Sequence, residues 1–173
     1  MYTFWDLLPA NCIIISAMEY LNGCTLEEMP ELQHMKVSKT AQSWPYYLRA
    51  KTGVATAYAF MLFPKKIKPG ISTYIQVIGD ISLFIDLTNN VLSFHKEYLA
   101  GETNNYVHNK AHVTGKSIQE TLREVTTDAL AAHARVKSVL QFTDKCTLWE
   151  QFVNGYLAFH VTQSRYRLND LSF

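Results

Sequence analysis

The stretch from Asn89 to Glu97, near the middle of the chain, constrains the fold more than any other segment. An α-helix turns by about 100° per residue, so in a helix Asn89, Ser93 and Glu97 share one face that spans about 80°. The residues on both sides of this stretch also favour helix. We therefore predict that these three polar side chains project together from one long helix.

The side chains on this face indicate a metal and a phosphate as ligands. An amide oxygen, a hydroxyl and a carboxylate are hard oxygen donors, which suit Mg²⁺ bound through one or two carboxylates and substrate phosphates. Lys96, beside Glu97, carries a compact positive charge suited to a phosphate oxygen. Taken alone, these nine residues are explained equally well by an ordinary polar stripe on an amphipathic helix.

Two other segments extend the pattern along the chain. The sequence Arg165-Tyr166-Arg167-Leu168 ends an aromatic helical run near the C-terminus, and Arg49 lies shortly before Gly53. Together with residues 89–97, these segments resemble class I terpene synthases, in particular the trichodiene synthase family. In that family the Asn/Ser/Glu triad binds metal, a later Arg-Tyr pair contacts the substrate diphosphate, and an arginine before a helix break senses it. The resemblance covers most of residues 10–170.

The resemblance implies a function for each polar residue of these segments. The predicted metal ligands form the triad on the helix face: Asn89, Ser93 and Glu97. The predicted contacts of the diphosphate are Arg49, Lys96, Arg165 and Tyr166. Of these four, Arg165 and Tyr166 are also the predicted catalytic residues. The implied fold is all-α, a truncated class I terpene synthase-like helical bundle, and the implied cofactor is Mg²⁺.

The implied activity is that of a sesquiterpene cyclase that ionises and cyclises farnesyl diphosphate. Ionising an allylic diphosphate requires neutralisation of the leaving group, which Mg²⁺ and cationic side chains provide. The carbocation then requires an apolar cavity with aromatic faces, and 13% of the chain is aromatic. The expected ligand is therefore an isoprenoid diphosphate or another terpenoid small molecule.

One departure from the family leaves a second hypothesis open. Class I terpene synthases carry an Asp-rich motif upstream of the triad, and the sequence before Asn89 contains none. The nearest imitation, Glu27-Glu28-x-x-Glu31, lies beside Pro30 and is typical of a loop. The alternative function is a metal-independent cyclase or isomerase acting on a terpenoid intermediate, or a non-catalytic terpenoid-binding relative. The first hypothesis is favoured by the retention of the triad together with Arg49, Lys96, Arg165 and Tyr166, because none of these has an obvious use without an anionic ligand.

Composition limits the domain organisation and the partners. With 48% hydrophobic and 18% charged residues, the chain suits a single α domain over residues 1–173. A net charge of +1 provides no field that would attract nucleic acid. Residues 7–21 are apolar but too short and too polar for a membrane span. The unpaired cysteine pattern and the lack of a basic leader favour the cytoplasm.

The expected length of the family's helical bundle adds a prediction about assembly. By the resemblance, a chain of this length forms only part of the bundle and leaves apolar faces on residues 4–22 and 45–63 exposed. Exposed patches of that size usually mark interfaces, so we expect a homodimer.

Helical periodicity and chain breakers predict the order of the elements. Residues 24–42 are predicted as a loop, and residues 104–115 as a polar connection. The predicted helices cover residues 4–22, 45–63 with a break near Gly53, 71–100, 116–141 and 145–168.

Overall fold

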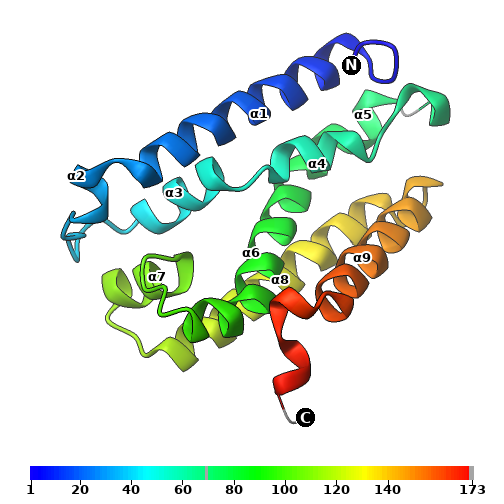
Figure 1. Ribbon diagram of the computed structural model, residues 1–173. Helices are drawn as coiled ribbons and strands as arrows, with labels where there is room; N and C mark the ends of the chain where they lie inside the picture. Colours follow the sequence, from blue (N-terminus) through cyan, green and yellow to red (C-terminus); the bar gives the residue numbers. More distant parts are fainter. Residues whose placement is uncertain (69, 172–173) are drawn as a thin grey trace.

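The computed structural model describes residues 1–68 and 70–171, and within these ranges every regular element is a helix. The all-α prediction is therefore confirmed (Figure 1). The α-helices are α1 (Leu7–Glu28), α2 (Pro30–Gln33), α3 (Trp44–Thr52), α4 (Ala55–Met61), α5 (Ile71–Tyr74), α6 (Ile78–Leu99), α7 (Tyr106–Thr114), α8 (Ile118–Leu140) and α9 (Lys145–Thr162). Short 3₁₀ turns are η1 (Lys65–Ile67), η2 (Ile75–Val77), η3 (Ser164–Tyr166) and η4 (Leu168–Asp170).

Helix α6 runs through the middle of the molecule, with α8 and α9 beside its lower part and α1, α3 and α4 above (Figure 1). Its apolar residues form the core with α4, α8 and α9, and Phe84 meets Trp149 edge to face with ring centroids 5.1 Å apart. The stretch Ile71–Leu99 is long and apolar enough to cross a membrane, but 61% of its apolar window is buried inside the fold. That burial is what the central helix of a packed core shows.

The predicted break near Gly53 is confirmed, because α3 ends at Thr52 and α4 begins at Ala55. Gly53 has extended backbone angles there. A Cβ at this position would lie 2.5 Å from Oδ1 of Asp86 and 2.7 Å from Nη1 of Arg49. A larger residue at position 53 would therefore displace Arg49 or Asp86, two side chains that belong to the candidate site.

The first helix was predicted over residues 4–22, with Asn22-Gly23 as its C-cap, and that end was wrong. Helix α1 continues through Gly23 to Glu28, and the prediction of a loop over residues 24–42 holds only beyond α2. Gly23 is buried against α3, where an added Cβ would collide with the backbone carbonyl of Lys51. This glycine serves the close packing of two helices rather than a C-cap.

The polar connection predicted at residues 104–115 contains a helix, α7. The side chain of Asn105 accepts a hydrogen bond of 3.0 Å from the backbone N–H of His108, and Gly115 follows the helix with φ of 70°. Residues that signalled a turn are therefore the two caps of a short helix.

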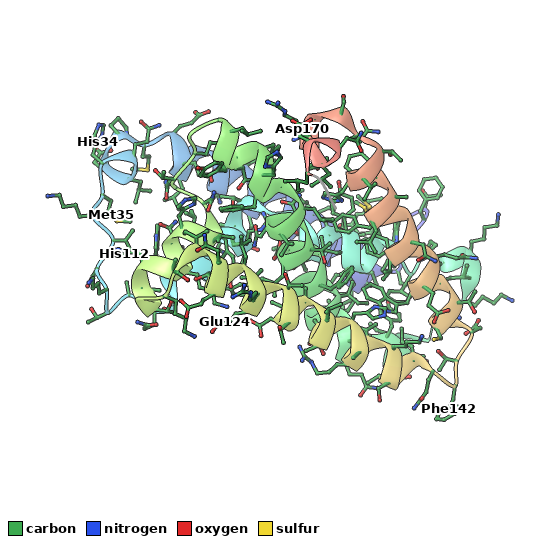
Figure 2. All side chains as sticks on the ribbon, turned by 90° about the horizontal axis from the view of Figure 1, so that it is seen from below. His34, Met35, His112, Glu124, Phe142 and Asp170 are labelled. Atoms are coloured by element: carbon green, nitrogen blue, oxygen red, sulfur yellow. The ribbon has the colours of Figure 1, made fainter. Side chains whose placement is uncertain are left out.

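Two predicted helices are shorter than the periodicity indicated. The segment 71–100 divides into α5, the turn η2 and α6, while α9 ends at Thr162, so the Arg-Tyr pair lies in η3 instead of the helix. The helix predicted over 116–141 is confirmed as α8. A capping box formed by Ser117 and Glu120 begins this helix. Figure 2 shows Phe142 at the tip of the turn between α8 and α9, where 92% of its surface is exposed.

The contact between α1 and α3 at Gly23 yields a stability prediction. Gly23→Ala should lower the free energy of unfolding by about 1–3 kcal/mol, because the methyl group meets backbone atoms that cannot turn aside. Gly155→Ala is the matched control, since nothing lies within 4 Å of a Cβ there and the helix α9 gains about 0.5–1 kcal/mol. Urea denaturation of both variants measures the two signs, and equal effects would contradict the packing role of Gly23.

Candidate functional site

A polar pocket of about 220 Å³ lies between α3, α6 and the segment that precedes α7. Side chains with amide or carboxylate oxygens dominate its lining, and Arg49 adds a positive charge. The lining residues are Glu27, Pro45, Leu48, Arg49, Thr52, Asn89, Asn90, Glu97, Glu102, Asn104, Asn105 and Tyr106. Three of the seven predicted site residues, Arg49, Asn89 and Glu97, therefore share one pocket.

Arg49 is held between two residues of α6. Its Nη2 lies 3.2 Å from Oδ1 of Asp86 and donates a hydrogen bond of 3.4 Å to Oδ1 of Asn89. The contact with Asp86 has ion-pair distance but lacks hydrogen-bond geometry, so that carboxylate oxygen is held by charge alone. Burial raises the pKa of Asp86 to about 6, although the Arg49 charge opposes the rise.

Sequence reasoning missed Asp86. Its side chain is 3% exposed, and it precedes Asn89 by about one helical turn on the same helix. An acidic residue one turn before the predicted ligand, inside an otherwise apolar run, was the signal available in the sequence.

The metal-ligand triad is ordered along α6 with Ser93 beneath Glu97. The Ser93 hydroxyl donates a hydrogen bond of 2.5 Å to Oε1 of Glu97, and Nζ of Lys96 lies 3.5 Å from the same oxygen. Ser93 is buried and does not line the pocket, so it joins the site through Glu97. The donor set of amide, hydroxyl and carboxylate fits Mg²⁺. Over residues 1–68 and 70–171, no three His, Cys, Asp or Glu side chains converge as a metal-binding group.

The Arg-Tyr pair lies beside the triad helix but outside the pocket lining. The turn η3 packs against α6, and Tyr166 is buried with its ring 4.5 Å from that of His160. Arg165 is exposed, with its guanidinium 5.1 Å from the centre of the Tyr166 ring. The diphosphate contacts of Arg165 and Tyr166 stay a prediction.

His160 links the two halves of this arrangement. It is 1% exposed, Nδ1 lies 2.8 Å from the backbone oxygen of Tyr156, and Nε2 lies 3.2 Å from Nδ2 of Asn89. Burial lowers the pKa of His160, and the nearby Arg165 charge lowers it further. His160 lies close to the Arg-Tyr pair in the sequence, but a lone histidine is usually structural, so its position alone did not assign it to the site.

Glu27 corrects the reading of Glu27-Glu28-x-x-Glu31 as a loop. Glu27 and Glu28 form the end of α1, Glu31 belongs to α2, and only Glu27 lines the pocket. Burial raises the pKa of Glu27 while Arg49 opposes the rise. The end of α1 thus adds one carboxyl group to the pocket rather than a cluster.

Comparison with known proteins gives one family. The model of the family described as Trichodiene synthase (TRI5) matches residues 1–172. Terpene synthase BipA of Cochliobolus sativus is 37% identical over 172 residues, which cover 98% of this chain and 53% of that protein. Longiborneol synthase CLM1 of Gibberella zeae is 34% identical, over 96% of this chain and 50% of its own length. Monoterpene synthase 25 of Postia placenta is 34% identical, over 99% and 51%. The chain spans about half the length of these relatives.

The raised pKa of Asp86 predicts how stability depends on pH. Between the ordinary value of 3.8 and about 6, the folded chain holds a proton that the unfolded chain has released. This group's contribution to the free energy of unfolding therefore falls as pH rises, by up to about 3 kcal/mol. Asp86→Asn removes the ionisable group, so the variant should lack this fall. Urea denaturation of both proteins at several pH values measures it, and parallel profiles would contradict the prediction.

Proposed function

The chain belongs to the trichodiene synthase family of terpene synthases, and we propose that its polar pocket binds the diphosphate of a prenyl diphosphate, with Mg²⁺, for terpene cyclisation. The proposed substrate is farnesyl diphosphate. The observation that carries the proposal is the Arg49 guanidinium, held by Asp86 and Asn89 in a pocket that Glu97 also lines.

Arg49 is suited to an anionic ligand by its remaining donors. A guanidinium has five N–H donors, and Nη2 makes both of the contacts described for Arg49. Nη1 takes part in neither of these contacts and remains to donate to an anion. Because Asp86 and Asn89 hold the side chain in place, little conformational entropy is lost when an anion binds. A diphosphate would satisfy donors that the protein leaves unused.

In this proposal Mg²⁺ would be held by the amide oxygen of Asn89 and the carboxylate of Glu97, which both line the pocket. The hydroxyl of Ser93, which donates to Glu97, would have to turn toward the ion to complete the triad. When bound, the ion would neutralise negative charge that develops on the leaving diphosphate. Lys96 keeps a positive charge beside Glu97, from where it can reach a phosphate oxygen. In this proposal Arg165 and Tyr166 approach the diphosphate from η3, across α6 from Arg49.

Calorimetric titration with inorganic diphosphate, with and without Mg²⁺, tests the site. Arg165→Ala should weaken binding by about 1.5–3 kcal/mol, the scale of a hydrogen bond to a charged group. Glu97→Gln should abolish the effect of Mg²⁺, because the triad holds only one charged ligand. Arg123→Ala, an exposed arginine on α8, is the control and should bind like wild type.

The outcome also separates the two functional hypotheses. If diphosphate at millimolar concentration fails to bind the wild-type chain with Mg²⁺ present, the alternative of a terpenoid ligand without diphosphate takes over. Incubation with farnesyl and geranyl diphosphate, with and without Mg²⁺, followed by analysis of volatile products, tests catalysis separately from binding.

We also propose that two copies associate through the exposed side of α1. Six large apolar side chains of this helix are well exposed: Leu7, Leu8, Ile14, Ile15, Met18 and Leu21. Contiguous exposed apolar surface of this kind usually marks an interface.

Ile15→Glu tests this association, because a charge at the centre of the apolar face opposes its burial. Sedimentation velocity at micromolar concentration should show a dimer for the wild type and a monomer for the variant. Phe142→Glu, which changes an exposed apolar residue at the turn between α8 and α9, should remain dimeric. A monomeric wild type would refute the proposal.

A further inference from the structure

Among the described residues, the buried ring of His160 is the only side chain of α9 within hydrogen-bond distance of the candidate metal ligand Asn89. Its Nδ1 lies 2.8 Å from the backbone oxygen of Tyr156, one turn earlier in α9. A carbonyl oxygen can only accept, so Nδ1 carries the proton. In the neutral ring Nε2 is then a bare acceptor, and Nδ2 of Asn89, 3.2 Å away, donates to it.

The other end of the Asn89 amide has an equally one-sided partner. The guanidinium of Arg49 can only donate, and its Nη2 lies 3.4 Å from Oδ1 of Asn89. An asparagine amide can usually turn by half a rotation with little cost, which exchanges its oxygen and nitrogen. Here such a turn would bring N–H against a donor and oxygen against the lone pair of Nε2. Both neighbours therefore select the same orientation.

We propose that His160 is a positioning residue that keeps the oxygen of Asn89 directed to the pocket, where it can bind a divalent cation. The inference rests on the proposed function, because it assumes that Asn89 is a ligand of Mg²⁺. Hydrogen-bonding partners behind metal ligands fix ligand orientation, and their loss typically lowers metal affinity by about 10- to 100-fold. The backbone carbonyl of Tyr156 on α9 thus sets the tautomer of His160, and this tautomer sets the orientation of the Asn89 amide in the pocket on α6.

A purely structural role for His160 makes a different prediction. The ring packs between Tyr156 and Tyr166, with centroids 4.6 Å and 4.5 Å away. Phenylalanine would preserve that packing and remove only the nitrogens. Glutamine would lose some packing but retain an oxygen that can accept from Nδ2 of Asn89. The two substitutions therefore separate packing from positioning.

The first measurement is the tautomer itself in the full wild-type chain. Long-range ¹H–¹⁵N spectra of histidine-labelled protein distinguish a proton on Nδ1 from one on Nε2. We expect His160 to be neutral with the proton on Nδ1. A proton on Nε2 would require Asn89 to turn its oxygen to the ring, which overturns the proposal without touching diphosphate binding by Arg49.

The second measurement is the gain in inorganic diphosphate affinity on adding Mg²⁺, by calorimetry. His160→Phe should reduce that gain by about tenfold or more while Mg²⁺-free binding stays within about twofold. His160→Gln should keep most of the gain. His133→Phe is the matched control, because His133 likewise packs between aromatic rings, those of Phe84 and Trp149, but has no hydrogen bond to Asn89 in the described part of the chain.

The possible results distinguish a failure of the proposed function from a failure of the positioning role of His160. A wild-type chain that shows no Mg²⁺-dependent diphosphate binding refutes the proposed function and, with it, this inference. If the wild type shows the Mg²⁺-dependent gain in affinity and a folded His160→Phe variant keeps all of it, the positioning role alone is refuted. If His160→Phe does not fold, the tautomer and the His160→Gln variant decide. A proton on Nδ1 together with a retained affinity gain in His160→Gln supports the positioning role. A proton on Nε2, or a loss of the gain in His160→Gln, refutes it.

Discussion

The buried contact between Arg49 and Asp86 is the interaction on which the rest of the site depends. With side chains only 14% and 3% exposed, both charges have lost most of their hydration, and such a pair contributes little net stability. Removing one partner is far more costly, by about 3–5 kcal/mol, because it strands a buried charge. The pair therefore adds little to the stability of the fold, but it disfavours any arrangement of α3 and α6 that would leave one of these buried charges without its partner. Gly53 ends α3 at the point where any side chain would enter this contact.

The features that were predictable from sequence are those governed by neighbours along the chain. The polar face of α6 follows from helical spacing, the start of α8 from the Ser117–Glu120 capping box, and the break before α4 from Gly53. The same rules gave a wrong end for the first helix at Gly23. A glycine that allows a neighbouring helix to pack closely cannot be distinguished in the sequence from a glycine that ends a helix. The helix α7 was missed for a similar reason. Its caps, Asn105 and Gly115, are residue types that occur equally in turns.

The parts of the site that could not be predicted depend on contacts between distant segments. The sequence places Asp86 one turn before Asn89, but only the structure shows that Arg49 on α3 lies beside it. Glu27 enters the pocket only because α1 extends past Gly23. Ser93 lies under Glu97 instead of on the pocket surface, which a helical projection cannot distinguish. Spacing predicts which side chains share a face, whereas depth along that face depends on what covers it.

Two hydrogen bonds tie α9 to α6 across the same sequence separation of 71 residues: His160 with Asn89, and the Tyr156 hydroxyl with the backbone oxygen of Ile85. Contacts between segments so far apart close large loops, and closing each loop costs conformational entropy. During synthesis, α6 leaves the ribosome well before α9, so its polar face exists for a time without its C-terminal partner. A correctly oriented Asn89 amide would therefore indicate that α9 has docked against α6.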